Sequence, residues 1–251
     1  MNPRTKKLLR KAKFVRTLSW LTFIPVAGTL MLVFRYVLRY RVENLAHWRK
    51  MYRALNQNGR PLLICANHLT YLDSVVLIYA FSHHLRYFMR FRTLPWNLPA
   101  IEYFKNPFFA LVGMTSKCLF IDRSGSKESH EALYDVAGTL LARGEVFTIF
   151  PEGRRSRTGM FDDRKLAYGI GKVVTRVPEV DVLCVYLRAK DQSRYSGFPK
   201  LGSRFILRAE KLVVQPTDSG RESVGQITQT IARKIQALEK QHFDCLSSTA
   251  G

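Results

Sequence analysis

Apolar and polar residues alternate in two different ways along the chain after Arg60. Short apolar runs bounded by turn-forming residues are typical of buried strands, whereas longer segments with a helical period of apolar residues are typical of helices. We expect strands at residues 61–66, 119–123, 145–150, 180–189 and 204–210, and helices at residues 71–81, 124–144, 162–177 and 222–241. This alternation predicts a single α/β domain, a sheet flanked by helices.

The N-terminal segment is apolar in its middle and basic at both ends. Residues 17–34 carry no charge, and clusters of Lys and Arg precede and follow them. This length is at the short limit for a membrane-spanning helix, and Pro25 and Gly28 would weaken it. A helix, or a bent pair of helices, lying in the membrane interface would place both basic flanks on one anionic leaflet. We expect residues 1–55 to associate with a membrane, by lying in its interface or by spanning it, with a buried core helix as the remaining alternative.

The α/β domain is expected to occupy residues 56–245, and residues 246–251 are expected to be frayed. Within the domain, residues 90–113 are rich in proline and aromatic residues, too punctuated for one long helix and too apolar for an ordinary loop. They either pack irregularly against the sheet or form an apolar wall that faces lipid or an acyl chain.

The composition is strongly basic, with 40 Lys and Arg against 19 Asp and Glu. A formal charge of +21 favours an anionic partner, which could be nucleic acid, anionic lipid or a phosphorylated substrate. The four cysteines are widely separated and form no CxxC pair, which predicts reduced thiols on the cytosolic side and neither a disulfide framework nor a metal site. The sequence contains no GxSxG elbow, P-loop or HExxH motif.

The first candidate site is the run NHLTYLD, residues 67–73, between a predicted strand and a predicted helix. On a regular helix the five-residue offset between His68 and Asp73 would turn them about 140° apart, too far to touch. Contact is feasible if the helix begins near Leu69 or Thr70 and His68 lies in the preceding turn. The aspartate would then fix the imidazole tautomer and leave the other nitrogen as a general base for a hydroxyl. With six histidines in the chain the spacing could arise by chance, but strand carboxyl ends are where α/β sheets bind ligands.

Two further polar clusters also follow predicted strands. In FPEGRRSR, residues 150–157, the proline and Gly153 let the backbone approach a ligand, the arginines can fork onto phosphate oxygens, and Ser156 could donate. The alternative is a solvated basic loop with a surface ion pair. In FIDR, residues 120–123, Arg123 ends another predicted strand, so the three clusters should converge on one edge of the sheet.

Together these runs resemble motifs of the glycerolipid acyltransferases. NHLTYLD resembles the NHx4D motif, FIDR the second motif and FPEGRRS the third, and the likeness covers residues 60–188. The resemblance implies a single-domain, glycerolphosphate-acyltransferase-like α/β fold, with His68 as the base and Asp73 orienting it. It also implies direct attack of an acceptor hydroxyl on the thioester of acyl-CoA or acyl-carrier protein, with no cofactor besides that co-substrate. The residues that it links to the acceptor phosphate lie in the second and third motifs: Arg123, Glu152, Gly153 and Ser156; Arg154 and Arg155 join them as candidates.

The sequence departs from the family pattern at two places. Lys117 stands where the second motif usually has a glycine, and the strand at 180–189 lacks the usual proline of the fourth motif. These departures affect the expected identity of the acceptor more than the expected chemistry of acyl transfer.

We expect a membrane-associated enzyme on the cytoplasmic face that acylates 1-acylglycerol-3-phosphate to phosphatidic acid. Its partners would be membrane lipid and acyl-CoA or acyl-carrier protein, without nucleic acid. The alternatives are another lyso-lipid acceptor, such as a lyso-ornithine lipid, or a non-catalytic basic protein that binds lipid or nucleic acid. Binding of nucleic acid would explain the charge but not the apolar N-terminal segment or the placement of His68.

Overall fold

A computed structural model describes residues 2–104, 113–192 and 197–249 of the chain. Its sheet has six strands in the order β1-β6-β5-β2-β4-β3. The strands are β1 (Arg41–Val42), β2 (Leu62–Ala66), β3 (Trp96–Asn97), β4 (Phe147–Ile149), β5 (Val180–Ala189) and β6 (Arg204–Val214). β2 pairs in parallel with β4 and β5, whereas β5 and β6 are antiparallel. The predicted α/β fold is confirmed.

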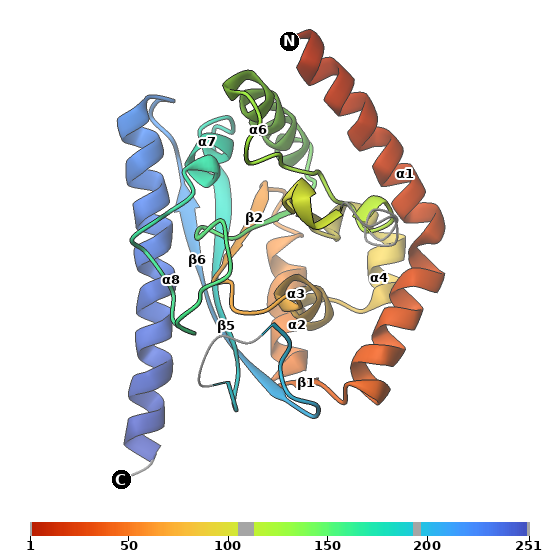
Figure 1. Cartoon of the computed structure of the whole chain (residues 1–251), viewed down its shortest axis with the longest axis vertical. Coiled ribbons are helices and arrows are strands. Elements are labelled where there is room, and N and C mark those ends of the chain that lie inside the picture. The colour runs from red at the N-terminus through yellow and green to blue at the C-terminus, as the bar shows by residue number, and fades with distance from the viewer. Residues whose placement is uncertain (1, 105–112, 193–196, 250–251) are drawn as a thin grey trace.

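Helices cover both faces of this sheet, as Figure 1 shows. They are α1 (Pro3–Leu32), which continues as the π-helix η1 (Val33–Val37), α2 (Leu45–Leu55), α3 (Asp73–Phe81), α4 (His84–Met89), α6 (Lys127–Ala142), α7 (Gly169–Val174) and α8 (Arg221–Thr249), with short 3-10 turns η2 (Phe91–Thr93) and η3 (Ile101–Phe104). Because strand side chains alternate, Leu63 and Cys65 of β2 belong to the core shared with α6, α7 and α8. Leu62, Ile64 and Ala66 belong to the core shared with α2, α3 and α4. Burial on both faces explains the continuous apolar run of β2.

Several predicted elements differ from the structure. Residues 119–123 form no strand; an isolated bridge between Ala100 and Ile121 joins this segment to the chain after β3, and a second bridge joins Asn97 to Cys118, just before the segment. The helix expected over 162–177 is limited to α7, which packs closely on α8: a Cβ on Gly171 would lie 2.3 Å from the Val224 carbonyl oxygen. The helix α8 extends to Thr249, and the fraying expected for residues 246–251 stays a prediction. The described part of 90–113 packs irregularly on the sheet through the fully buried Trp96, and residues 105–112 lie outside the described residues.

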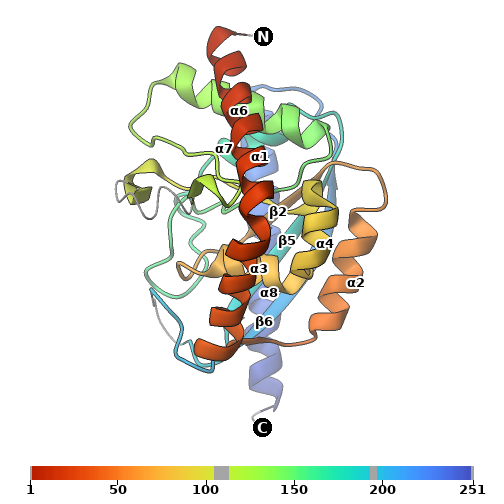
Figure 2. The same cartoon turned by 90° about the vertical axis from the view of Figure 1, so that its right-hand side faces the viewer.

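The N-terminal segment is one continuous helix rather than a bent pair. One face of α1 is buried against the domain by Leu9, Ala12, Val15, Phe23 and Ala27, whose spacing is helical. Away from that face the helix exposes Phe14, Leu21 and Leu32, and Trp20, Ile24 and Leu30 are also partly exposed. By length and composition, the helix from Pro3 to Val37 could cross a membrane, a property that the core helices of soluble proteins and signal sequences can share. Figure 2 shows α1 running along the side of the domain, next to α4.

Candidate active site

His68 lies in the turn between β2 and α3, as the sequence predicts. The helix begins at Asp73 rather than near Leu69, because the Asp73 carboxylate organises the turn that precedes it. Its Oδ2 atom accepts the backbone N–H groups of Leu69 at 2.6 Å and Thr70 at 2.9 Å, and its Oδ1 atom accepts the Thr70 hydroxyl at 2.6 Å. These bonds fold the turn back over the helix start, and the His68 Nδ1 atom comes within 2.8 Å of Oδ2.

The imidazole of His68 is held in one orientation. It stacks on the Phe150 ring with a centroid distance of 4.1 Å, and its side chain is 21% exposed. An ionised carboxylate can only accept, so Nδ1 carries the proton toward Asp73 and Nε2 carries the lone pair. A partly exposed imidazole in this tautomer can take a proton from a hydroxyl.

The loop 150–159 is bonded to the backbone of His68 from both sides. The His68 N–H donates to Glu152 Oε1 at 2.8 Å, and the Ser156 N–H donates to the His68 carbonyl oxygen at 2.8 Å. Arg123 joins the loop through a 2.5 Å bond from its Nη2 atom to the Gly153 carbonyl oxygen. Gly153 has a φ of 60°, which favours glycine. The structure therefore brings the three predicted clusters together.

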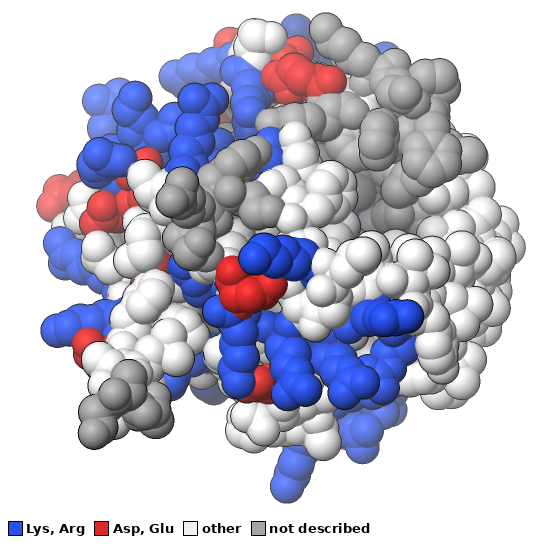
Figure 3. Space-filling view, turned by 60° about the horizontal axis from the view of Figure 1, so that its bottom comes forward, with Lys and Arg blue, Asp and Glu red and all other residues white. Residues whose placement is uncertain are grey.

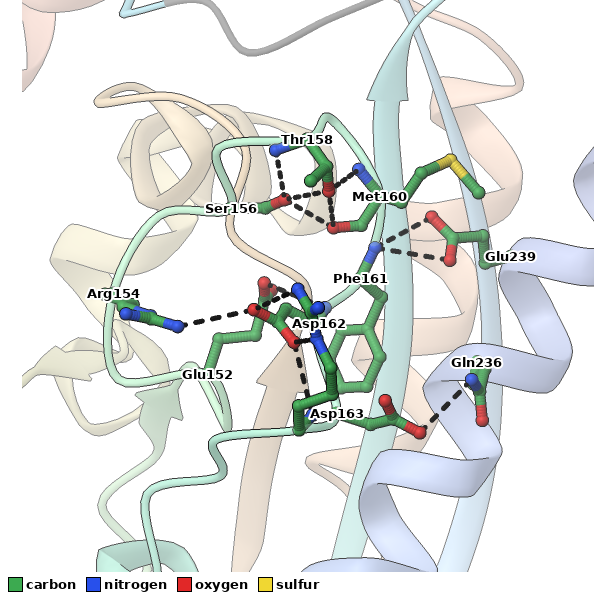
Figure 4. Close-up of polar contacts among 11 residues, drawn as sticks. Glu152, Arg154, Ser156, Thr158, Met160, Phe161, Asp162, Asp163, Gln236 and Glu239 are labelled. Carbon is green, nitrogen blue, oxygen red and sulfur yellow. Dashed lines mark hydrogen bonds and ion pairs between the residues drawn. The ribbon is translucent and has the colours of Figure 1, made fainter.

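Within this loop, the candidate phosphate-binding side chains differ in their partners. Glu152 and Ser156 are buried, and besides the bond of Glu152 to His68 both side chains bond to the chain just after the loop: Glu152 Oε2 accepts the Asp162 N–H at 3.3 Å, and the Ser156 hydroxyl donates to the Met160 carbonyl (Figure 4). Arg154 pairs with Asp162 at 3.3 Å. The guanidinium of Arg155 lies 3.5 Å from the centre of the Tyr71 ring, on the run that carries His68. The bonds of Glu152 and Ser156 thus fix the conformation of the loop, whereas Arg123 and Arg155 lie at its surface.

The carboxyl of Glu152 has a strongly shifted pKa. Burial is the largest effect and raises the pKa to about 8, although the hydrogen bonds from the backbone N–H groups of His68 and Asp162 act to lower it. The carboxyl is therefore largely protonated at neutral pH, so it places little negative charge beside His68 and Arg123.

Glu152→Gln is expected to flatten the pH dependence of stability. The folded protein keeps the Glu152 proton up to about pH 8, whereas the unfolded chain loses it near 4.5, so the free energy of unfolding should fall as pH rises through this window. The wild type should lose up to about 5 kcal/mol over this range from this group. Urea denaturation across the window would measure the slope, with the exposed acid Glu102 replaced by Gln as a control. Equal slopes in wild type and Glu152→Gln would contradict the assignment.

The helix α8 bonds to the residues that follow this loop, and β5 bonds to the loop itself. Both carboxylate oxygens of Glu239 accept the Phe161 N–H, at 3.1 and 3.2 Å, and Gln236 donates to Asp163 at 3.3 Å (Figure 4). The buried Arg188 donates to the Gly159 carbonyl oxygen at 2.6 Å. Arg188 is visible in the sequence as a charge ending an apolar strand, whereas nothing distinguishes Glu239 from the surface acids of an amphipathic helix.

Sequence reasoning also gave no role to Asn67 or to Lys117. Asn67 is fully buried and exchanges two side-chain hydrogen bonds with the Leu187 backbone, at 2.9 and 2.7 Å, which extends the pairing of β2 with β5 up to His68. Lys117 has a φ of 48°, in the region that glycine adopts readily, which explains why glycine suits this position. Its ammonium group is buried against Glu145 at 2.6 Å. The departure from the family pattern at Lys117 therefore changes a buried position of the core.

Comparisons with known proteins place these residues in a family. A family model described as Acyltransferase matches residues 39–216. N-acylphosphatidylethanolamine synthase of Arabidopsis thaliana is 30% identical over 133 residues, which cover 50% of this chain and 43% of that protein. This chain therefore spans less than half the length of that relative.

Among solved structures, a crystal structure of the 1-acyl-sn-glycerophosphate (LPA) acyltransferase PlsC from Thermotoga maritima matches 95% of this chain and 98% of its own, at 17% identity and a TM-score of 0.47. The family model spans well over half of the chain and includes His68, Asp73, Arg123 and the loop 150–159. The chain therefore belongs to the acyltransferase family, as its resemblance to the glycerolipid acyltransferases indicates.

Proposed function

We propose that the protein transfers a fatty acyl group from acyl-CoA or acyl-carrier protein to the free hydroxyl of a lysophospholipid. The first choice of acceptor is 1-acylglycerol-3-phosphate, which would give phosphatidic acid. The observation that carries this proposal is the 2.8 Å pair of His68 and Asp73 at the carboxyl end of β2. The arginines beside it suit an acceptor that carries a phosphate.

In the proposed reaction, Nε2 of His68 removes the proton of the acceptor hydroxyl while its oxygen attacks the thioester carbonyl carbon. The tetrahedral intermediate then collapses, the carbon–sulfur bond breaks, and the thiolate takes the proton from the imidazolium. Asp73 holds Nδ1–H throughout and stabilises the imidazolium charge. Thioesters are reactive electrophiles, so a positioned base and a bound acceptor suffice for this chemistry.

Arg123 is the main candidate for binding the acceptor phosphate. Its side chain is exposed, and the bond to the Gly153 carbonyl uses one of its five N–H donors. That bond fixes the guanidinium near the loop that holds His68, and other donors stay available to phosphate oxygens.

Arg123→Ala is expected to raise the acceptor KM about 10- to 100-fold, because a charge-assisted hydrogen bond to phosphate is lost. The kcat at saturating acceptor should change much less, since the His68–Asp73 pair is untouched. Initial rates at varied acceptor concentration would measure both, with the exposed Arg143 on the far end of α6 replaced by Ala as a control. An unchanged acceptor KM would remove Arg123 from the phosphate site.

Association with an anionic membrane surface, on the cytoplasmic side, is part of the proposal. One face of α1 is buried against the domain, so its exposed apolar face is the part that lipid could cover, which favours an interfacial helix. Figure 3 shows one end of the molecule, where Lys and Arg side chains gather beside a broad uncharged surface. Such a combination suits an anionic leaflet.

Leu21→Glu combined with Leu32→Glu is expected to weaken binding to anionic vesicles at least about tenfold, since two exposed apolar side chains of α1 become charged. Vesicle flotation would measure it, with the exposed Leu246 of α8 replaced by Glu as a control. These substitutions are preferable to deleting residues 1–40, because Phe34 and Tyr40 are buried in the core. Unchanged flotation would place the membrane contact elsewhere.

A panel of acceptors, assayed with one acyl-CoA and one acyl-carrier protein, tests the proposed reaction. The panel should contain 1-acylglycerol-3-phosphate, other lysophospholipids, a lyso-ornithine lipid and phosphatidylethanolamine, whose amine is included because of the name of the Arabidopsis relative. Turnover should be fastest with a phosphate-bearing lyso-lipid. Turnover of the amine alone, or of no acceptor by folded protein, would refute the proposed O-acyl transfer.

A further inference from the structure

A cavity that we term the α1–α4 groove lies away from His68. It has a volume of about 560 Å³, and its lining includes Arg16 and Trp20 of α1, Met89 of α4, and Arg60, Arg90 and Arg92 from the segments beside them. The lining also reaches Leu62, the first residue of β2, whereas His68 is the second residue after the end of that strand. At about 3.3 Å per residue, β2 alone separates the two places by about 13 Å.

The groove is positively charged. Four arginines line it, and no Asp or Glu is among its described lining residues. Arg16 and Arg60 pair with acids outside the lining, Glu145 at 2.7 Å and Glu179 at 3.3 Å. No ion pair within the described part of the chain involves Arg90 or Arg92.

The neighbourhood of the groove adds to this charge. The pKa of Arg86, one turn before Arg90, is lowered by burial and then by the positive charges of Arg53 and Arg90. An anion bound here would relieve this repulsion. Guanidinium groups bind phosphate oxygens well because their donors are planar and fixed.

One side of the groove is apolar and exposed. Arg16, Trp20 and Ile24 follow at four-residue spacing, so they share one face of α1. The Trp20 ring stacks on Phe88 of α4 at 5.3 Å, and Met89 beside it is 75% exposed. Figures 1 and 2 both show α4 lying beside α1. Cations and exposed apolar side chains in the same groove suit an amphiphile rather than a soluble anion.

We propose that the α1–α4 groove binds the headgroup of an anionic phospholipid, with its phosphate on Arg90 and Arg92 and its acyl chains over Trp20 and Met89. This site is separate from the proposed acyl-transfer site, and it does not depend on which acceptor His68 activates. It would fix the orientation of the domain on the membrane through a specific lipid contact, in addition to the diffuse attraction of the basic surface.

Trp20 provides a direct readout, because it is exposed while Trp48 and Trp96 are buried. The full chain, in the His68→Ala form so that no turnover interferes, would be titrated with monomeric dioctanoyl phosphatidylglycerol, dioctanoyl phosphatidylcholine or inorganic phosphate. We expect a saturable blue shift with phosphatidylglycerol that disappears in Trp20→Phe. Arg90→Gln with Arg92→Gln should weaken this binding about 30-fold, while Arg221→Gln with Arg233→Gln, which removes two exposed arginines of α8, should leave it unchanged.

The outcomes separate the possible ligands. Equal affinity for phosphatidylcholine would refute the preference of the groove for an anionic headgroup. Equal affinity for inorganic phosphate would refute the proposal that the ligand is a lipid. Retained binding in the Arg90 and Arg92 variant would overturn the assigned residues. Met89→Glu offers a second variant, which should weaken binding of the lipid without altering the fold, since Met89 is exposed. Because the titration needs no catalysis, failure of the acyl-transfer proposal would not affect it.

Discussion

Replacing His68 by alanine is expected to lower kcat for acyl transfer about 10²- to 10⁴-fold. Among the described groups bonded to Asp73, the imidazole is the one with a nitrogen left to accept a proton, and its position is set by Phe150 and by the loop bonded to its backbone. Alanine removes the base but keeps both backbone bonds of residue 68, so the fold should persist. Release of the thiol from acyl-CoA, followed with the best acceptor of the panel, would measure the loss.

Two further variants separate catalysis from structure. Asp73→Asn keeps an acceptor oxygen for the turn but offers the imidazole a neutral partner that can also donate, so it should lower kcat through the wrong tautomer. His47→Ala removes an exposed histidine of α2 and should leave the rate unchanged. Turnover near that of the wild type in a well-folded His68→Ala protein would refute the role of this residue as the base.

The His68–Asp73 pair could be inferred from the sequence because its geometry is local. The two residues are five positions apart, and helical rotation rules out contact between them on one regular helix, which favours a turn before the helix. The start of the helix was predicted a few residues too early. Its position depends on how the Asp73 carboxylate collects the N–H groups of Leu69 and Thr70, and spacing alone does not show this.

The roles of the side chains in the loop 150–159 are harder to predict from the sequence, because they depend on contacts between residues that are far apart in the chain. Glu152 and Ser156 look like ligand-binding groups in sequence, yet their side chains bond to backbone groups of His68, Asp162 and Met160. Phe161, just after the loop, is bonded in turn by Glu239, 78 positions later. The predicted strand at 119–123 failed for a related reason. Its apolar residues pair with the irregular chain near β3, so burial without a regular ladder produced the same pattern as a strand.

Lys117→Met is expected to lower the free energy of unfolding by about 3–5 kcal/mol, the range measured when one partner of a buried ion pair is removed. The Lys117 ammonium donates to Glu145 Oε2 at 2.6 Å and to the carbonyl oxygens of Phe91 and Leu94 at 3.1 and 2.6 Å, and the residue is 0% exposed. Methionine fills similar space but donates to none of them, so three buried acceptors lose a partner.

The two charges depend on each other. Burial lowers the pKa of Lys117 to about 8, although the charge of Glu145 raises it. Burial alone would raise the pKa of Glu145, but the charge and hydrogen bond of Lys117 and the bonds from Trp96 and Arg16 outweigh it, and the pKa lies below its usual value. Because Arg16 belongs to α1 and bonds Glu145 at 2.7 Å, the pair also anchors that helix to the domain.

A double-mutant cycle tests this dependence. Lys117→Met with Glu145→Gln removes both charges, so it should cost clearly less than the sum of the two single variants, with a coupling of about 1–3 kcal/mol in urea denaturation at neutral pH. Lys190→Met, which breaks the exposed 2.7 Å pair with Glu43, should cost less than about 1 kcal/mol. Additive effects at positions 117 and 145, or a Lys117→Met cost no larger than that of Lys190→Met, would show that the two buried charges do not stabilise the fold through each other.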